Sequence, residues 1–255
     1  MSSDQVSQKV TQLVLNCDIG ESFGAWKMGL DDEVMPHIDW ANVACGFHAG
    51  DPSVMKKTVQ LAQKHNVVVG AHPSYPDLNG FGRRSMKCSA QELTDLIQYQ
   101  VGALAGIAKV VGTSIDYVKP HGALYNDMMA EPAVLRTVFE AVRTYDARLA
   151  IVVLATTEND AVRQLAMELD VQVKFEAFAD RAYTASGLLV PRTQKGAVHH
   201  DVETIVKQAQ KISRGEPLQT LDGKTIVIEA DTLCVHGDNA SSIEAIKSIR
   251  AALSR

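Results

Sequence analysis

Seven short apolar segments recur along the chain, and each is followed by a polar cluster and then by a stretch with helical periodicity. The apolar segments are rich in β-branched residues and mostly continuous, which is typical of parallel strands that are buried on both faces. The pattern predicts strands at Val10–Asp18, Trp40–Cys45, Asn66–Ala71, Ile115–Val118, Leu149–Leu154, Val171–Phe178 and Thr225–Val235.

Helix signals stand between these segments. Asp51-Pro52 predicts an N-cap followed by proline at the first helical position. Ser89 and Glu92 form the S-x-x-E pattern of a capping box, and Ser241 repeats it three residues before a glutamate. Helices are therefore predicted from Pro52 to about His65, from the Ser89 cap to about Val111, at Ala133–Tyr145, at Glu158–Leu169, at His200–Ser213 and from the Ser241 cap onward.

Strands that alternate with helices in this way predict an α/β fold, because right-handed crossover connections make consecutive strands parallel. A length of 255 residues with 46% hydrophobic composition suits a single (β/α)7 barrel of the TIM type. We expect residues 11–255 to form this barrel and residues 1–10 to be a disordered extension. The active site of such a barrel lies at the carboxyl ends of the strands. In the alternative, an open doubly wound sheet, only the strand ends near the switch point would meet.

Ionisable side chains stand where the predicted strands end. In Val118-Lys119-Pro120-His121 the strand stops at Pro120, which lacks an N–H to donate, so the lysine and the histidine lie at its end. Four of the eight histidines follow strands in this way, and histidine exchanges protons near neutral pH. The candidate catalytic residues are Asp18, Glu21, His48, Lys119, His121, His236 and Asp238, and the candidate substrate-binding residues are Asn16, Arg83, Arg84, Asp180 and Arg181.

Structural roles compete with these assignments. A single histidine after a strand is often only a hydrogen-bonded structural residue. Asp18 and Glu21 could cap the turn after the first strand. Asp180 could form a local ion pair with its neighbour Arg181. Lys119 could bind an anion, form a Schiff base or lie in solvent, and anion binding is favoured.

A metal site is a further hypothesis, because Asp18, His72 and His121 offer a carboxylate and two imidazoles at strand ends. These are the ligand types of a catalytic divalent ion such as Zn²⁺ with one open coordination position. The sequence has no HExxH or HxH spacing to support such a site. In addition, the charge of Lys119 would repel a nearby cation.

Composition narrows the class of function. The net charge of −5 and the pI near 5.9 come without a long basic run, so the footprint of a nucleic-acid-binding protein is missing. The longest apolar stretch, Leu149–Ala155, is too short to cross a bilayer, and the N-terminus has no signal-peptide pattern. Four cysteines without a CxxC pair suggest a reducing, cytoplasmic compartment. We expect chemistry on a small molecule.

Five segments together resemble the LamB/YcsF family: Leu15–Gly24, Asn42–Pro52, Gly70–Asp77, Lys119–Tyr125 and Val235–Asp238. The resemblance extends from about residue 12 to the C-terminus. It implies a seven-stranded (β/α) barrel related to the glycoside hydrolase/deacetylase superfamily. It also implies a role in the ATP-dependent opening of 5-oxoproline to glutamate, together with 5-oxoprolinase B and C subunits. Some members are linked to the use of other lactams.

The resemblance and the candidate residues lead to one hypothesis. Partner subunits would use ATP to phosphorylate the lactam oxygen, which supplies a leaving group and an anion to hold. This chain would then deliver water, with Asp18 or Glu21 as the base, His121 or His236 as the proton donor and Lys119 as the anion clamp. The rival hypotheses are a stand-alone metal-dependent deacetylase and a non-catalytic scaffold that only shapes the partner subunits.

Overall fold

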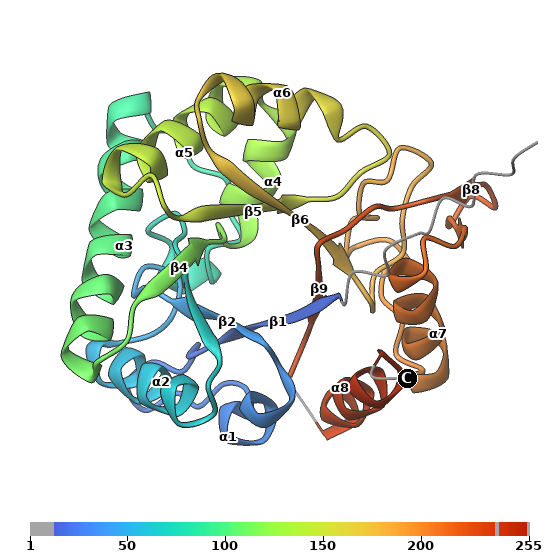
Figure 1. The fold of residues 1–255 in the computed structure, drawn as a ribbon, viewed down its shortest axis with the longest axis horizontal. Coiled ribbons are helices and arrows are strands. Elements are labelled where there is room, and N and C mark those ends of the chain that lie inside the picture. Colours follow the sequence, from blue (N-terminus) through green and yellow to red (C-terminus); the bar gives the residue numbers. More distant parts are fainter. Residues whose placement is uncertain (1–12, 238–239, 254–255) are drawn as a thin grey trace, which may run out of the picture.

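Seven parallel strands form a closed barrel (Figure 1). The computed structural model describes residues 13–237 and 240–253, so the predicted extension at residues 1–10 lies outside the described residues. In barrel order the strands are β1 (Val14–Ile19), β2 (Trp40–Ala44), β3 (Val68–His72), β4 (Ile115–Val118), β5 (Ala150–Leu154), β6 (Gln172–Phe178) and β9 (Thr232–Val235). Because β9 pairs with both β6 and β1, the predicted (β/α)7 barrel is confirmed and the open sheet is wrong.

Helices surround the strands and connect them (Figure 1). The predicted helix starts at Asp51 and Ser89 are confirmed, because the Asp51 carboxylate accepts the backbone N–H groups of Ser53 and Val54 and Ser89 forms a reciprocal capping box with Glu92. None of the described helices is both long and apolar enough to cross a membrane. The helices are α1 (Asp31–Val34), α2 (Pro52–Lys64), α3 (Ala90–Val111), α4 (Gly122–Ala130), α5 (Pro132–Tyr145), α6 (Asp160–Glu168), α7 (Val202–Ser213) and α8 (Ala240–Leu253), with 3-10 turns η1 (Met35–His37) and η2 (Leu78–Gly80).

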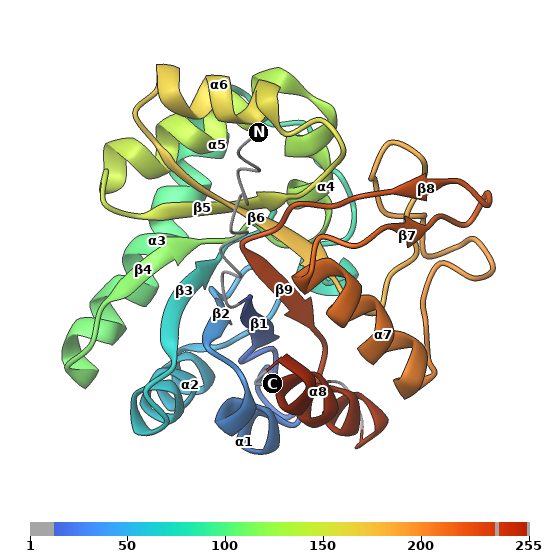
Figure 2. The same cartoon turned by 45° about the vertical axis from the view of Figure 1, so that its right-hand side comes forward.

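The last predicted strand, Thr225–Val235, is divided in the structure. Its first part, β8 (Thr225–Ile226), pairs antiparallel with β7 (Leu218–Gln219), and only β9 enters the barrel. Gly223, with φ +79°, provides the left-handed conformation that the connecting turn requires. Figure 2 shows this pair of short strands outside the barrel, near α7.

Two helix predictions also need correction. α8 begins at Ala240, so Ser241 lies inside its first turn and is not the N-cap. The helix that begins directly after His121, α4, is separate from α5, whereas the sequence predicts a single helix at Ala133–Tyr145 for this unit. His121 therefore stands at the point where a strand end passes into a helix.

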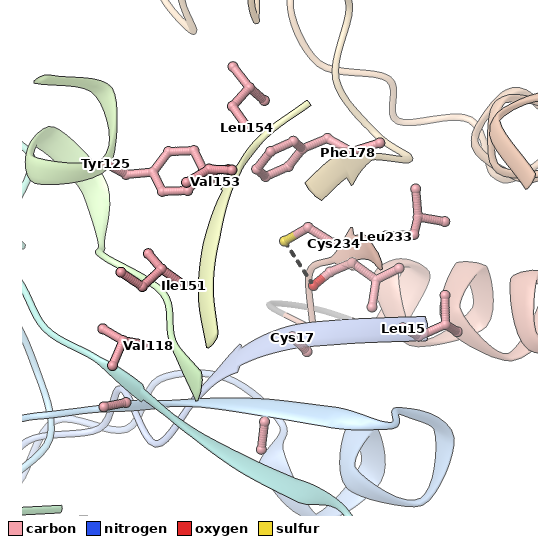
Figure 3. Packing of buried hydrophobic residues seen from close by; sticks show 14 of the residues in the cluster. Leu15, Cys17, Val118, Tyr125, Ile151, Val153, Leu154, Phe178, Leu233 and Cys234 are labelled. Atoms are coloured by element: carbon pink, nitrogen blue, oxygen red, sulfur yellow. Dashed lines mark hydrogen bonds between the residues drawn. The ribbon is translucent and has the colours of Figure 1, made fainter. Parts of the chain in front are cut away.

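Alternate residues of each strand face opposite sides of the barrel wall. Outward-facing side chains such as Val118, Ile151 and Val153 belong to the main core, which Figure 3 shows. On the inside, Trp40 stacks on Tyr117 with ring centroids 4.5 Å apart and packs with three small apolar residues. These apolar side chains fill the interior toward the amino ends of the strands. The interior toward the carboxyl ends is therefore left to polar side chains.

Gly70 on β3 gives the Tyr117 ring its place. A Cβ atom at Gly70 would lie 2.1 Å from the ring, far inside van der Waals contact. The Tyr117 hydroxyl in turn donates a hydrogen bond of 2.7 Å to Asn42 Oδ1. Because Gly70 has no side chain, the Tyr117 ring can lie against β3, and this position brings its hydroxyl to the polar side chain of Asn42.

Gly70→Ala is expected to lower the free energy of unfolding by about 1–3 kcal/mol, because the added methyl group overpacks the barrel. Urea unfolding with an unchanged m-value measures this loss. Gly106→Ala is the matched control, since a Cβ there meets nothing within 4 Å on the exposed face of α3. That control should instead stabilise the protein by about 0.5–1 kcal/mol. Equal effects of the two changes would contradict the assigned packing of Tyr117.

Candidate functional site

The strand ends open into a cavity of about 480 Å³. Most of the predicted site residues line it, although they come from opposite ends of the sequence. These residues are Asp18, Glu21, His72, Arg83, Lys119, His121, Arg181 and His236. The barrel geometry thus brings them together as expected for parallel strands that end on one face.

The floor of the cavity is built around the ammonium group of Lys119. Its Nζ lies 2.7 Å from Glu176 Oε1 and 3.0 Å from Asp18 Oδ1, and the residue is only 3% exposed. Burial alone would lower the pKa of Lys119, but the nearby carboxylates outweigh it and raise the pKa well above its usual value. The lysine is therefore charged, which does not fit a Schiff-base role. Its predicted role as an anion clamp is also weakened, because its contacts are with the protein.

Asp18 stands between Lys119 and the histidines. Its Oδ1 atom accepts hydrogen bonds from Lys119 Nζ and from Asn42 Nδ2 at 2.8 Å, and it lies 3.4 Å from His72 Nε2. Burial would raise the pKa of this carboxyl group, but the electrostatic interactions with His72 and Lys119 hold it well below its usual range. Asp18 is thus an ionised carboxylate with 19% of its side chain exposed at the cavity.

A chain of buried amides and hydroxyls supports these charges from below. Tyr117 donates to Asn42, Asn42 donates to Asn16 Oδ1 at 2.7 Å, and Asn16 donates to Thr232 Oγ1 at 2.8 Å. Asn16 is fully buried and lies beneath the cavity. Asn16 Oδ1 lies 3.2 Å from the Lys119 ammonium, and its contact with a substrate stays a prediction.

Three histidines and Glu21 gather on one side of the cavity. The rings of His48 and His121 stack with centroids 3.7 Å apart, and His72 Nε2 lies 3.0 Å from His121 Nδ1. Glu21 Oε1 lies 3.1 Å from His48 Nε2. Burial lowers the pKa of His48 and of His121 well below the usual value, and the neighbouring imidazoles add to this effect. These two rings are therefore neutral at neutral pH.

A fourth histidine has the opposite character. His236 Nδ1 lies 2.8 Å from Asp180 Oδ2. Burial would lower the pKa of His236, but the charge of Asp180 and the hydrogen bond to it raise the pKa above its usual value. Asp180 correspondingly has a lowered pKa, because His236 outweighs the effect of burial. The ionised carboxylate of Asp180 thus stabilises the protonated form of His236.

Of the three predicted arginines, Arg83 and Arg181 line the cavity. Arg181 donates to the backbone carbonyls of Val190 and Ala197, so the expected ion pair with Asp180 is not among the described contacts. Arg84 pairs with Asp77 and is absent from the residues that line the cavity. Arg83 does line the cavity, as does Arg192, which the sequence patterns did not single out.

The structure adds residues that sequence reasoning missed. Glu176 is fully buried, and its Oε2 accepts a hydrogen bond of 2.9 Å from Tyr125. Asn42 holds Asp18, and Cys234 Sγ lies 3.3 Å from Lys119 Nζ. Glu176 stands two residues before Phe178, which lines the cavity, so the alternation of side chains along β6 places both on the inner face. The predicted residue Asp238 lies outside the described residues.

Comparison with known proteins gives consistent matches over almost the whole chain. The model of the LamB/YcsF family matches residues 13–255. A Pseudomonas putida protein, named as the second of its 5-oxoprolinase A subunits, is 59% identical over 99% of this chain and 98% of its own length. A Pseudomonas fluorescens protein, named as a 5-oxoprolinase A subunit, is 60% identical over 96% of this chain and 98% of its own. A crystal structure of a lactam utilization protein from Thermus thermophilus has a TM-score of 0.88 at 39% identity, covering 95% of this chain and 96% of that chain.

Glu176→Gln is expected to lower the free energy of unfolding by about 3–5 kcal/mol, because it removes one partner of a buried ion pair. Urea unfolding measures the loss. In a double-mutant cycle, Lys119→Met combined with Glu176→Gln should cost less than the sum of the two single changes. Glu168→Gln is the control, since Glu168 forms an exposed pair with Arg136 and should change stability by less than about 1 kcal/mol. If the free-energy changes of the two single variants add up to that of the double variant, Lys119 and Glu176 are not energetically coupled.

Proposed function

Because the chain belongs to the LamB/YcsF family, we propose that it is the A subunit of a 5-oxoprolinase that opens the lactam ring of 5-oxoproline to give glutamate. Two relatives of at least 59% identity over nearly their full lengths are named as 5-oxoprolinase A subunits. The observation that carries the proposal is the pairing, at one cavity, of an ionised carboxylate at Asp18 with a proton-holding histidine at His236.

The reaction needs activation that this chain does not supply. An unstrained lactam is a poor electrophile, so the proposed B and C subunits use ATP to phosphorylate the lactam oxygen. Water then adds to the ring carbon, the ring nitrogen takes a proton, and the C–N bond breaks to leave an acyl phosphate. A second water molecule cleaves the acyl phosphate to the side-chain carboxylate and inorganic phosphate. The step that decides between ring opening and reversal is the protonation of the nitrogen.

The site supports a division of roles between the two sides of the cavity. Asp18 orients the attacking water and stabilises positive charge, since a carboxylate of lowered pKa is a weak base that stays ionised. His236 is a better proton donor than His121, because its pKa is raised whereas that of His121 is lowered. The first candidates to hold the substrate carboxylate and phosphate are Arg83 and Arg192, which line the same cavity.

The proposed setting is the cytoplasm, where ATP is available for the partner subunits. No disulfide joins the four cysteines, all of which lie in the described part of the chain, and this accords with a reducing compartment. The net charge of −5 favours neither a nucleic acid nor an acidic membrane surface as a partner.

Asp18→Asn and His236→Gln are each expected to lower kcat for ring opening by about 10²–10⁴-fold, because each removes a group that handles water or a proton. The measurement is glutamate production by the assembled subunits with 5-oxoproline and ATP. Asp95→Asn, an exposed change of the same chemistry on α3, should keep the wild-type rate. Phosphate release without matching glutamate formation in the His236 variant would support its role as donor. Wild-type glutamate production in both variants would remove these residues from the mechanism.

Asp180→Asn is expected to move the alkaline limb of the kcat/KM profile to lower pH. Asp180 raises the pKa of His236, so losing its charge lets the donor proton dissociate at a lower pH. A pH–rate series for ring opening measures the shift, and Asp180→Glu should restore the limb toward its original position. An alkaline limb that stays in place in Asp180→Asn would assign that limb to another group.

A further inference from the structure

His72 and His121 each commit one ring nitrogen to a backbone carbonyl. His72 Nδ1 lies 2.6 Å from the oxygen of Lys119, and His121 Nε2 lies 2.9 Å from the oxygen of Phe81. A carbonyl oxygen accepts hydrogen bonds and has no hydrogen to donate. Each of these nitrogens must therefore carry the hydrogen, and in a neutral ring the second nitrogen is left with a bare lone pair.

The two remaining nitrogens face each other. His72 Nε2 and His121 Nδ1 lie 3.0 Å apart, and both residues are almost fully buried. Two lone pairs at this distance repel, and buried polar atoms without a partner are costly. The arrangement is stable only if a positive species lies between or beside them.

The loop that contacts His121 is shaped to hold this arrangement. Phe81 has φ +54°, which is uncommon for a residue with a side chain, and Gly82 has φ +62°. A Cβ atom at Gly82 would lie 2.8 Å from His48 Cβ and 2.9 Å from His121 Cδ2. The loop can thus lie against both imidazoles and bring the Phe81 oxygen to His121. A carbonyl that fixes the tautomer and orientation of an imidazole is the usual outer support of a metal ligand.

Two further donor atoms complete the group. Ligand atoms of Glu21, His48, His72 and His121 all lie within 4.8 Å of one another. Glu21 Oε1 is 3.7 Å from His121 Nδ1, and it carries the negative charge that a divalent cation needs. Bonds of about 2.0–2.1 Å from Zn²⁺ to nitrogen place two ligands roughly 3.0–3.5 Å apart, which matches the separation of the two facing nitrogens.

We propose that Glu21, His72 and His121, with His48 as a fourth donor, form a binding site for a divalent transition-metal ion such as Zn²⁺. Imidazole and carboxylate ligands of this kind suit zinc and its neighbours in the first transition series. When bound, the ion would supply a Lewis acid at the edge of the cavity. The site goes beyond the proposed ring opening, because it concerns metal affinity and holds whatever the substrate is.

The assigned ligand set replaces the trio expected from the sequence, in which Asp18 was the carboxylate. Asp18 Oδ1 already accepts hydrogen bonds from Lys119 and Asn42. A second group of potential ligands, Asp18 with Cys234 and His236, has the same disadvantage, since Lys119 Nζ lies 3.3 Å from Cys234 Sγ. A metal ion in either place would face an ammonium group at close range, whereas Glu21 contacts His48 and His121.

Zinc titration of the purified, chelator-treated chain tests the site without any assay of catalysis. The wild-type chain should bind one equivalent of Zn²⁺, and Co²⁺ should give visible absorption bands in its place. His72→Gln and His121→Gln should each weaken Zn²⁺ binding by more than about 100-fold, since even outer-shell changes cost 10–100-fold. Circular dichroism of each variant shows that it is folded. His236→Gln is the matched control, and it should bind zinc as the wild type does.

Two results would overturn the proposal. The first is a wild-type chain that binds no more Zn²⁺ than the folded His72→Gln/His121→Gln double variant, as expected if the two rings share a proton instead of a metal ion. The second is a loss of affinity in Asp18→Asn that exceeds the loss in Glu21→Gln, which would remove Glu21 from the ligand set. A larger loss in Glu21→Gln than in Asp18→Asn supports the set as assigned.

Discussion

The interior of the barrel depends on one buried cation. Lys119 brings an ammonium group between Asp18 on β1 and Glu176 on β6, at 3.0 and 2.7 Å. None of these three charges could be buried alone without a large desolvation penalty, and each is satisfied only when all three strand ends are in register. Two carboxylates against one ammonium leave a surplus negative charge. Of the two carboxylates, Asp18 lines the cavity, whereas Glu176 is fully buried.

The outline of the site follows from the sequence because it rests on local patterns and one geometric rule. A strand such as Ile115–Val118 ends where Pro120 removes a backbone donor, and the next polar residues must then lie at the carboxyl end. Parallel strands carry all such ends to the same face. Lys119, His72 and His121 could therefore be placed at one mouth without knowing which strands are neighbours. The capping signals at Asp51 and Ser89 are equally local, and the structure bears both out.

Contacts across the barrel could not be predicted in the same way. Glu176 lies inside a buried strand, and its partner Lys119 is identified only by the closed order of strands, which no local pattern encodes. Adjacency in the sequence is likewise a poor guide to which side chains contact each other. Asp180 and Arg181 are adjacent, but they follow the end of β6, where the chain bends and the alternation of a strand no longer holds. Asp180 thus turns to His236, and Arg181 turns to the carbonyl of Val190.

The fixed position of Asp18 helps to explain how one small cavity can hold both neutral histidines and a protonated one. Its carboxylate lies 3.4 Å from His72 Nε2, and a ligand atom of His236 lies within 4.8 Å of it. A negative charge near both groups stabilises positive charge at either of them. With Lys119 and Asn42 holding Asp18 in place, a cation beside His72 and a proton on His236 would stay a few ångströms apart. A substrate bound between the cation and His236 would then contact a Lewis acid through one of its atoms and a proton donor through another.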